Sequence, residues 1–514
     1  MSELTQLGKN TWQRVLNVII WSALFAIAYS QSPLYTSNQN QYFLQGLARG
    51  GLGTLQSDWL ANTRDPTPVF SVLVELTYRY FQHEALFYLY YAALMGLYLF
   101  CLYGIASTLF NINSSKIKSL FFFAMLITIH SAGLRFALSR VVGVNWAYVL
   151  EDGVADQRIL GPVFQPSTFG VFLILSIFLF LKRHPFIAVL LASLAAIIHP
   201  TYLLAAAALT VSYMLITWLE ERQLKKSLLL GLLALISVSP IILYSWGTFV
   251  GGATETISQA RQILVDFRIP HHAKIGFWFD ATVVAKLLII TFSLYLTRGK
   301  RVFGVLLVSS IFALTLTLLQ VLTKNTALAL IFPWRISTYL LPIATTICCA
   351  VILDRLFDFP WFKSPRRQKL IEIIAILMIF LSVFVGGIRF WLDQERKNEA
   401  AERTMEAYID AHHSSEDVYL IPVKLQDFRL AAGTPAYVDF KSIPYQEMDI
   451  LEWYRRVQLA DHFYQTLDCS VLTNMVDRGG ITHVLIELDQ PVLPCDNLAE
   501  IYRDPHYRIY QISP

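Results

Sequence analysis

Charged side chains are scarce in this sequence. Of its 514 residues only 15% are Asp, Glu, Lys or Arg, whereas 55% are hydrophobic and the mean hydropathy is +0.49. Soluble proteins carry charge on about a quarter of their residues, so the composition excludes an ordinary soluble fold. The formal net charge is only +4. It gives no reason to expect a nucleic-acid partner, which needs a concentrated basic surface.

Two kinds of functional motif are also missing. The sequence has no G-x-x-x-x-G-K-[ST] loop, which argues against ATP-driven transport. No Cys or carboxylate stands at ligand spacing from the adjacent histidines His271 and His272. A divalent cation would therefore be a cofactor without a clear ligand set in this chain.

Cysteines are few, and they fall into two groups. Cys101, Cys348 and Cys349 lie in apolar runs, where we expect inert packing. Cys469 and Cys495 lie in the polar last quarter of the chain, and an oxidising compartment would allow them to form a disulfide. Closing a loop of about 25 residues in this way would stabilise the fold by about 3 kcal/mol.

Long apolar runs separated by short loops are what the sequence has in abundance. The expected membrane spans are Val15–Ala28, Ala85–Phe110, Leu120–Phe136, Thr168–Leu181, Pro185–Ile198, Tyr202–Leu219, Leu228–Trp246, Ala281–Leu296, Val302–Leu322, Ile336–Leu356 and Ile371–Phe390. Several are shorter than the ~20 apolar residues that cross a bilayer. Short segments flanked by proline are typical of helices that break inside a protein-lined cavity.

Lys and Arg gather in alternate loops, which the positive-inside rule places in the cytoplasm. These residues are Lys116, Lys118, Lys182, Arg183, Arg222, Lys225, Lys226, Arg298, Lys300, Arg301, Lys363, Arg366, Arg367 and Lys369. Lys9 and Arg14 place the N-terminus on the same side, and an odd number of spans then places the C-terminus outside. Ala26-Ile27-Ala28 resembles a signal-peptidase site, but we expect an uncleaved anchor.

The predicted fold class is mainly α, a polytopic helical membrane bundle of about 11 spans with a C-terminal exported α/β domain. Residues 1–390 form the bundle, with outer loops 29–84, 137–167 and 247–280, and residues 391–514 form the exported domain. Alternating strand and helix patterns in that domain predict a mostly parallel sheet. The expected strands are Asp417–Pro422, Ala436–Phe440, Thr482–Glu487 and Tyr507–Gln511, and the expected helices are Glu395–His412, Ile450–Gln465 and Val471–Arg478.

The first outer loop is the richest in candidate functional residues. Asn38–Arg49 has the periodicity of an amphipathic helix that lies at the membrane interface. Asp58 and Asp65 follow, and either carboxylate could act as a general base; we prefer Asp65, which lies nearer the membrane. The alternative is that Asp65 only caps the next helix, with Pro66 at its first position, and that Arg64 is a surface charge.

Three arginines and one histidine at the expected outer face oppose the usual charge bias. Arg135, Arg140, His199 and Arg335 are suited to an anionic group such as a lipid phosphate. Structural alternatives remain for each. They are ion pairs of the two loop arginines with Glu151, Asp152 or Asp156, a capped helix break at His199, and headgroup anchoring by Trp334 with Arg335.

The layout resembles the GT-C class of integral-membrane glycosyltransferases. The shared features are a cytoplasmic N-terminus, a long first outer loop with interface helices and acidic residues, many spans and an outer α/β domain at the C-terminus. Three stretches also resemble a group of bacterial membrane proteins that is frequent in cyanobacteria. They are Asp58-Trp59 through Asp65-Pro66-Thr67-Pro68-Val69-Phe70, His199-Pro200-Thr201-Tyr202, and Phe428-Arg429 through Asp439-Phe440-Lys441. Residues 30–56 contain no acidic residue, whereas GT-C enzymes often carry one directly after the first span.

This resemblance implies a polyprenyl-phosphate-linked sugar donor, used at the periplasmic face of the bacterial inner membrane. The site would be walled by the first outer loop, the Arg135–Arg158 loop and the C-terminal domain. The general base would be Asp65 or Asp58, and the phosphate ligands would be Arg135, Arg140, His199, Arg335 and Arg64. A single displacement would invert the sugar. The expected partners are the bilayer and the lipid-linked donor, with no nucleic acid. The alternative functions are a transporter or lipid flippase and a non-catalytic membrane scaffold.

Overall fold

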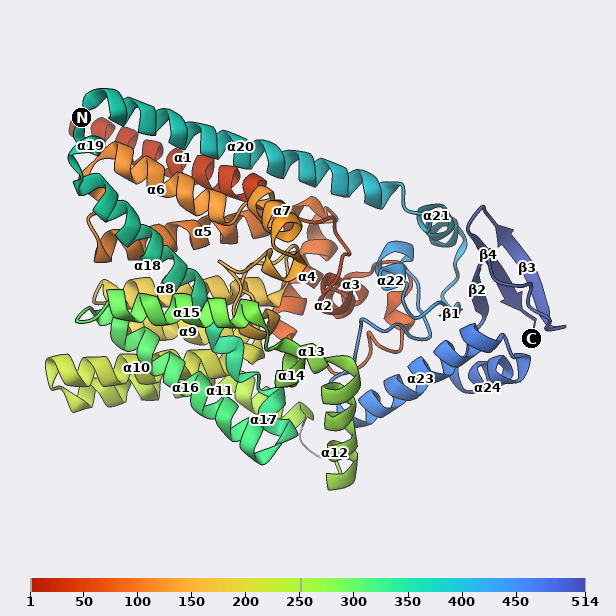
Figure 1. The fold of residues 1–514 in the computed structure, drawn as a ribbon. Helices are drawn as coiled ribbons and strands as arrows, with labels where there is room; N and C mark the ends of the chain where they lie inside the picture. The colour runs from red at the N-terminus through yellow and green to blue at the C-terminus, as the bar shows by residue number, and fades with distance from the viewer. Residues whose placement is uncertain (1, 250–251, 514) are drawn as a thin grey trace. The chain divides into compact units, whose positions relative to one another are not determined.

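The computed structural model describes residues 2–249 and 252–513, with side chains from residue 12 onward. The side chain of Lys9, which entered the orientation argument, lies outside that range. The chain is mainly helical, with a small sheet in its C-terminal segment (Figure 1). It divides into two compact units. Unit 1 comprises Met1–Gln31, Phe87–Leu243 and Ile269–Trp391, and unit 2 comprises Ser32–Leu86, Tyr244–Arg268 and Leu392–Pro514.

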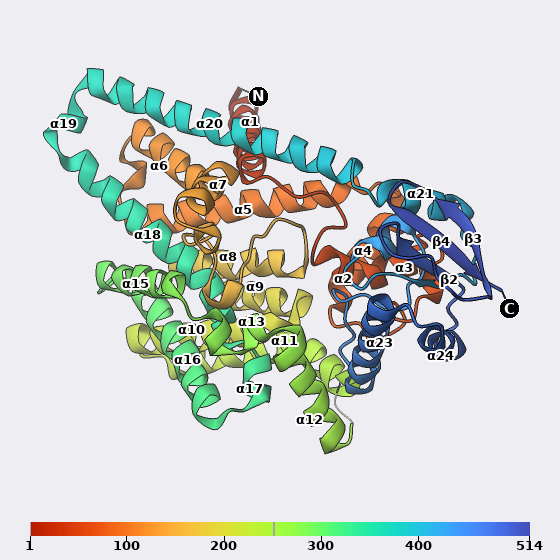
Figure 2. The ribbon, with the colours of Figure 1, turned by 45° about the vertical axis from the view of Figure 1, so that its right-hand side comes forward.

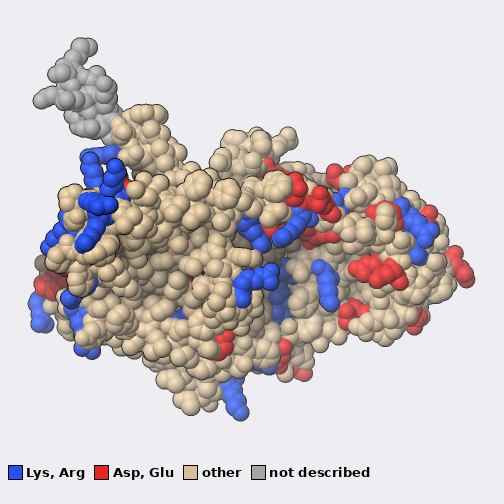
Figure 3. Space-filling view, turned by 45° about the horizontal axis from the view of Figure 1, so that its top comes forward, with Lys and Arg blue, Asp and Glu red and all other residues tan. Residues whose placement is uncertain are grey.

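Long apolar helices dominate unit 1. Within the described residues, 7 helical segments are long and apolar enough to cross a membrane. They are Trp12–Tyr29 in α1 (Ser2–Tyr29), α5 (Ala85–Leu109), Pro200–Glu221 with α10 (Leu203–Glu221), α11 (Leu224–Phe249), α16 (Arg301–Thr323), Thr326–Asp358 with α17 (Thr326–Leu330) and α18 (Ser337–Asp358), and α20 (Pro365–Asn398). They expose large apolar side chains such as Leu243, Leu322 and Phe380, and a space-filling view shows broad areas without charged residues (Figure 3). Such surfaces are those of a membrane protein.

One predicted span consists of two helices. The segment Leu120–Phe136 is divided between α6 (Lys116–Ile129) and α7 (Ala132–Val141), which are bent by 54°. His130 ends α6, and the hydroxyl of Ser131 accepts a hydrogen bond from the backbone of the next helix. Because these local side-chain bonds compete with the helical ladder, the apolar pattern continues through the bend while the helix does not.

Three shorter apolar helical segments complete the set. They are Pro166–Leu181, which comprises η5 (Pro166–Gly170) and α8 (Val171–Leu181), α9 (Pro185–Ile198) and α15 (Ala281–Leu296). With the long helices and the bent pair, they coincide with the predicted apolar runs; that about eleven of them cross the bilayer stays a prediction. α8, α9 and α10 pack in succession, α10 also packs on α16, and α15 packs on α18 (Figure 2).

Short helices and turns connect the long helices of unit 1. They are η2 (Ile112–Ser114), η3 (Val144–Trp146), η4 (Val154–Asp156), η6 (Pro200–Tyr202), α13 (Pro270–Ala273), α14 (Ile275–Trp278), η8 (Pro333–Ile336) and α19 (Pro360–Lys363). α20 approaches α1 closely at Gly386, where an added Cβ would come within 2.1 Å of the Ile27 carbonyl oxygen. Only glycine allows the two helices to pack at that distance.

Three separate segments of the chain form unit 2. Its helices are α2 (Gln39–Tyr42), α3 (Leu44–Gly50), η1 (Leu55–Ser57), α4 (Pro68–Phe81), α12 (Thr254–Ile263), the π-helical turn η7 (Leu264–Arg268), α21 (Arg403–His412), α22 (Phe428–Ala432), α23 (Glu447–Thr466) and α24 (Cys469–Gly479). The amphipathic helix predicted over Asn38–Arg49 is thus two helices, α2 and α3. Its apolar residues Phe43 and Leu47 are fully buried. The helix predicted over Glu395–His412 is interrupted between α20 and α21.

The sheet of unit 2 has four strands in the order β1-β2-β4-β3. β1 (Tyr419–Leu420) pairs parallel with β2 (His483–Glu487), but β4 (Tyr507–Ile512) pairs antiparallel with both β2 and β3 (Leu498–Arg503). The prediction of a mostly parallel sheet is therefore wrong, because a β3–β4 hairpin follows β2 in place of another strand and helix. The expected strand at 436–440 makes only an isolated bridge to β1, and the exposed strand β3 was not predicted.

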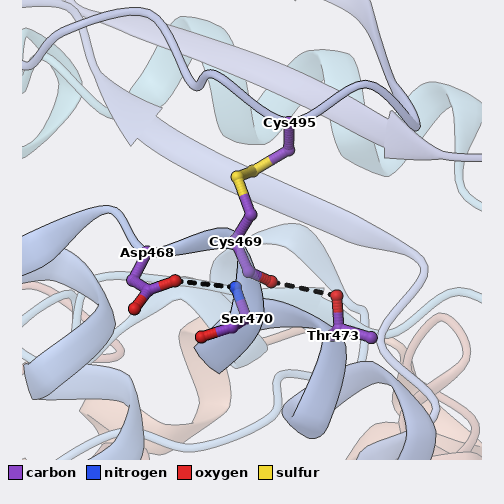
Figure 4. Close-up of a disulfide and its surroundings, with 5 residues drawn as sticks. All are labelled: Asp468, Cys469, Ser470, Thr473 and Cys495. Atoms are coloured by element: carbon purple, nitrogen blue, oxygen red, sulfur yellow. Dashed lines mark hydrogen bonds between the residues drawn. A yellow bond between two sulfur atoms is a disulfide. The ribbon is translucent and has the colours of Figure 1, made fainter.

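Two features hold the C-terminal part of unit 2 together. Trp453 and Phe463 of α23 share an apolar core with Val484 of β2. The predicted disulfide between Cys469 and Cys495 is confirmed, with Cα atoms 5.7 Å apart (Figure 4). It links the first residue of α24 to the loop before β3, so it fixes the segment on which the edge hairpin stands.

Candidate functional site

Asp58, one of the two candidate bases, is buried in unit 2 with both carboxylate oxygens engaged. Its Oδ2 accepts hydrogen bonds from Arg429 Nε at 2.8 Å and from the Ala436 backbone N–H at 3.1 Å. Its Oδ1 accepts a third from the Ala61 backbone N–H at 3.0 Å, and its exposed fraction is 0%. A general base must reach the proton it removes, so this geometry favours a structural role for Asp58.

The partner of Asp58 is a guanidinium shared by two carboxylates. Arg429 of α22 binds Asp58 and Asp439, and it also donates to the Ala436 carbonyl oxygen at 2.7 Å. Asp439 accepts a further bond from the Ser442 backbone N–H at 2.7 Å. All three charged side chains are buried. The cluster ties the segment before α4 to the C-terminal segment, and the two carboxylates share the one guanidinium.

Asp65 is the candidate base with the more open surroundings. Its Oδ1 accepts from the Thr67 backbone N–H at 2.9 Å, and its Oδ2 accepts from Arg49 Nη2 at 3.1 Å. The predicted cap is wrong by two residues, since α4 begins at Pro68 with Thr67 as its N-cap. Asp65 instead forms a turn with its own backbone two residues on. Arg64 beside it is exposed, as its surface-charge interpretation expects.

A polar cavity of about 470 Å³ lies beside Arg49 in unit 2. Its lining residues are Ala48, Arg49, Gln56, Ala61, Asn62, Glu75 and Arg79. Glu75 holds both arginines, with Arg49 Nε at 3.0 Å and Arg79 Nη2 at 2.8 Å. Amide, carboxylate and guanidinium groups together offer donors and acceptors to a hydroxylated ligand, and the volume suits a small molecule.

Arg135 in unit 1 is enclosed by protein groups. Its Nη1 donates to the His130 carbonyl oxygen at 2.8 Å and to Glu151 Oε1 at 3.2 Å, and its Nη2 donates to the Tyr29 carbonyl oxygen. The Tyr29 ring centre also lies 4.2 Å from the guanidinium carbon. The structure thus contains the ion pair with Glu151 that was the alternative to phosphate binding.

Arg158, in the segment after α7, is paired with a carboxylate as Arg135 is. Arg158 Nη2 lies 2.9 Å from Asp152 Oδ2, while burial raises the pKa of the Asp152 carboxyl against the opposing effect of Arg158. Arg140 differs, since it is exposed and its guanidinium lies 5.3 Å from the Phe136 ring centre. Arg140 thus contacts the Phe136 ring of its own helix, and no ion pair with a carboxylate of the described residues holds it.

His199 and Arg335 are brought together, although 136 residues separate them in sequence. Arg335 Nη2 donates to His199 Nε2, and Nη1 donates to Gln157 Oε1. The Tyr202 ring centre lies 5.0 Å from the guanidinium carbon. No carboxylate in the described part of the chain forms an ion pair with Arg335. Its partners are neutral, because an imidazole that accepts a hydrogen bond carries no charge, so its positive charge is not compensated locally.

An apolar cavity of about 790 Å³ lies in unit 1 beside the chain segments that carry this pair. Its wall includes Pro200 and Thr201, which directly follow His199, and Phe332, three residues before Arg335. The rest of the lining comes from α9, α10, α11 and α17 with the residue after it: Ser193, Leu203, Leu204, Ala206, Ala207, Thr210, Val211, Met214, Gly231, Ala234, Leu235, Val238, Ile242, Leu330 and Ile331. Such a wall suits a hydrocarbon chain, because it offers almost no hydrogen-bonding partner.

Metal-ligand chemistry has little to build on in the described residues, among which no group of three or more His, Cys, Asp or Glu could hold a metal ion. The adjacent histidines singled out in the sequence are not such a site. His272 Nδ1 donates to the Ala155 carbonyl oxygen at 2.8 Å, which gives that imidazole a structural partner.

The candidate residues therefore divide between the two units. Asp58, Asp65 and Arg64 belong to unit 2, whereas Arg135, Arg140, His199 and Arg335 belong to unit 1; a single site that unites them stays a prediction. The sequence analysis missed the partners that decide their roles. Arg429 lies 371 residues from Asp58, and Gln157 lies 178 residues from Arg335. One sequence contains no local pattern for such pairings.

Comparison with known proteins covers only a small part of the chain. Residues 400–460 match a family described as a domain of unknown function (DUF6798). This segment contains α21, α22 and the first part of α23, and with them Arg429 and Asp439. No curated protein matches the chain. The match is limited to residues 400–460 and assigns them no chemistry.

Proposed function

We propose that this chain is an integral-membrane glycosyltransferase that uses a polyprenyl-phosphate-linked sugar. The observation that supports the proposal best is the apolar cavity beside the His199–Arg335 pair in unit 1. A polyprenyl phosphate joins a long hydrocarbon chain to an anionic group, and unit 1 offers a partner for each. The apolar wall would take isoprenoid units, and the uncompensated guanidinium would take the phosphate.

In this proposal Arg335 is the principal phosphate ligand and His199 positions it. Transfer begins when an acceptor hydroxyl attacks the anomeric carbon of the sugar and its proton passes to a general base. The bond from that carbon to the phosphate oxygen breaks, and polyprenyl phosphate leaves with the bonding electrons. Arg335 stabilises the negative charge that develops on the leaving oxygen. A single displacement of this kind inverts the anomeric centre.

We assign the role of general base to Asp65 in preference to Asp58. Asp65 is held by one backbone N–H and by Arg49, whose side chain is 42% exposed. Asp58 lacks such an opening, because Arg429 and two backbone N–H groups occupy its oxygens. Of the two carboxylates that the sequence suggested as general base, Asp65 therefore remains.

The proposed location is the bacterial inner membrane, with about eleven spans, the N-terminus in the cytoplasm and the C-terminal segment in the periplasm. The basic residues in alternate loops support this orientation. The disulfide in unit 2 agrees with it, since disulfides persist in the periplasm and are rare in the cytoplasm. A single cysteine in place of Ser364, between two basic loop residues, should resist membrane-impermeant thiol reagents in intact cells.

Turnover of a tagged polyprenyl-phosphate sugar by the purified full chain in detergent would test the activity. Arg335→Met should lower the rate about a hundredfold, because a charge that stabilises the leaving group is lost. Ala207→Trp, which fills the apolar cavity, should weaken donor binding about tenfold while the charged pair stays intact. Arg298→Met is the matched control, since Arg298 is an exposed arginine of unit 1 outside this region.

The outcome separates the proposed enzyme from its alternatives. Loss of turnover in Arg335→Met and Ala207→Trp, with wild-type turnover in Arg298→Met, would support the transferase. Donor binding without any transfer to any acceptor would support a lipid flippase or a membrane scaffold instead. Equal behaviour of all three variants would remove the cavity and Arg335 from the function.

A further inference from the structure

Helix α4 of unit 2 has an apolar face that the described residues leave exposed. Val69, Val72, Leu76 and Tyr80 follow one another at intervals of three or four residues, which places them on one side of a helix. Their exposed fractions lie between 42% for Val69 and 72% for Tyr80. We refer to these four side chains as the apolar face of α4. Phe81, the last residue of the helix, is also exposed.

The opposite side of α4 is fixed against its own unit. Phe70 and Val74 are fully buried, and α4 packs on α3. The two helices approach closely at Gly46, where an added Cβ would come within 2.6 Å of the Ser71 carbonyl oxygen. This packing fixes the rotation of α4 about its own axis, so the fold of unit 2 itself turns the apolar face outward.

Exposed apolar side chains are otherwise scattered in unit 2. Among its described residues, the large ones outside α4 are Trp246 of α11, Met448 of α23, Val492 in the loop before β3 and Ile501 of β3. Single exposed apolar residues are ordinary on protein surfaces, whereas a contiguous set marks an interaction surface. The apolar face of α4 therefore requires a partner that is itself apolar.

A helix suited to crossing the membrane follows α4 directly in the chain. Only residues 82–84 separate Phe81 from α5, which begins at Ala85 and is long and apolar enough to cross a membrane. Because consecutive Cα atoms are about 3.8 Å apart, α4 ends within about 15 Å of that helix. We propose that α4 lies in the membrane interface, with its apolar face in contact with the phospholipid bilayer.

The length and the flank of α4 fit this position. With 14 residues the helix is shorter than the ~20 that cross a bilayer, so it lies along the surface, as amphipathic helices do with their apolar faces about 5–10 Å deep. Tyr80 stands at the end that leads to α5, and tyrosines are enriched at membrane interfaces. Arg79 borders the apolar face with a side chain that is 48% exposed, so its guanidinium can remain among the headgroups.

This position differs from the one that the sequence suggested for an interface helix. That helix was expected over Asn38–Arg49, but Phe43 and Leu47 of the segment are fully buried. α4 takes the role because its apolar residues face outward. The inference does not depend on the proposed glycosyl transfer, since it uses neither Asp65 nor Arg335.

Spin labels on the full chain, reconstituted in phosphatidylcholine nanodiscs, would test the contact. Leu76→Cys and Val72→Cys each take one nitroxide on the apolar face, and both positions are exposed, so the substitutions should spare the fold. Molecular oxygen concentrates in hydrocarbon and a polar nickel chelate in water. Relaxation by oxygen relative to nickel should therefore be several-fold stronger at these labels than at Lys424→Cys. Lys424 is an exposed lysine of the same unit, and the labelled wild-type chain corrects for signal from the native cysteines.

The outcomes decide between lipid, water and protein as the partner of the apolar face. Stronger relaxation by oxygen at both α4 labels would support the proposal, and no enzymatic activity enters the measurement. Relaxation by nickel equal to that at Lys424→Cys would place the face in water and overturn the proposal. Protection from both reagents would show that protein covers the face and would also overturn it; dipolar broadening between labels would then identify the cover as a second copy of the chain.

Discussion

Units 1 and 2 each hold an arginine among hydrogen-bonding partners, Arg335 half-buried in unit 1 and Arg429 buried in unit 2, but the partners differ in charge. Arg429 of unit 2 meets two carboxylates, Asp58 and Asp439. Arg335 of unit 1 meets the neutral side chains of Gln157 and His199. A guanidinium between carboxylates is compensated and holds chain segments together. A guanidinium held by neutral groups is also positioned, but its charge is not compensated by those partners.

Whether an arginine has a carboxylate partner does not depend on the unit in which it lies. Arg135 in unit 1 is paired with Glu151, so it belongs with Arg429 and not with Arg335. Arg268 in unit 2 donates to the Lys441 carbonyl oxygen, and no carboxylate of the described residues forms an ion pair with it. The presence of a carboxylate partner therefore marks Arg429 and Arg135 as structural, whereas ligand binding by Arg335 stays a proposal.

The largest effect should come from removing the guanidinium that two carboxylates share. Arg429→Met leaves Asp58 and Asp439 buried without their cation, which should lower the free energy of unfolding by about 3–5 kcal/mol. Thermal and urea unfolding of the purified chain would measure it. Arg503→Met is the control, because Arg503 is 57% exposed and its surface pair should contribute no more than about 1 kcal/mol. A small change in Arg429→Met would contradict the structural role of the cluster.

Reduction of the disulfide should produce the next largest effect, and should act on unit 2. The Cys469–Cys495 bridge spans 26 residues, and opening it should lower the free energy of unfolding by about 3 kcal/mol. The described cysteines of unit 1, Cys101, Cys348 and Cys349, are not bridged. Proteolysis with and without reductant would locate the change. A double Cys469→Ser and Cys495→Ser variant should no longer respond, and new cleavage confined to unit 1 would argue against this assignment.

Sequence patterns predicted the elements whose cause is local. The apolar runs became the long helices, because a span is defined by continuous hydrophobicity. The pairing of Cys469 with Cys495 followed from their shared polar region. The division of the span at 120–136 was not predicted, because Ser131 and His130 bend the helix through side-chain bonds that leave the hydropathy unchanged.

The roles of charged residues were less predictable, because they depend on partners distant in sequence. Asp58 had no visible structural duty until Arg429 was placed against it. The burial of Arg268 could not be predicted, because no sequence pattern distinguishes a buried arginine between two helices from an exposed one. The edge strand β3 was missed for a related reason, because its exposed position removes the apolar alternation that marks a strand.

A pH-dependent effect, which accumulates over several pH units, should come from Glu406, a buried carboxylate whose cation, Arg403, is shared with Asp427. Burial raises the pKa of Glu406 to about 8. Between its ordinary pKa and that value the native state holds a proton that the unfolded state has lost. The contribution of Glu406 to stability should therefore be fully present below its ordinary pKa and be lost as the pH rises toward 8, by up to about 1.4 kcal/mol per pH unit.

Urea unfolding of Glu406→Gln across this pH range would test the carboxylate, since the amide cannot ionise and the slope should flatten. The control is Glu416→Gln, an exposed glutamate of the same unit, which should keep the wild-type slope. An unchanged slope in Glu406→Gln would mean that Arg403 compensates this carboxylate as fully as Arg429 compensates Asp58.

The smallest effect on stability should come from Asp65→Asn, and it is the most informative for function. Asn keeps the Oδ1 that accepts from Thr67 and loses the charge that faces the half-exposed Arg49. Because Asp65 itself is buried, the free energy of unfolding should fall by about 1–2 kcal/mol. Transfer of the sugar should nevertheless be lost, because an amide cannot accept the acceptor's proton. Asp58→Asn should do the reverse, since it disturbs a buried cluster and leaves the proposed base in place. Measuring stability and turnover of both variants together separates the two aspartates. Wild-type turnover in Asp65→Asn would remove the base from the proposed mechanism, whereas loss of turnover in a fully stable Asp58→Asn would transfer that role to the residue we assign to structure.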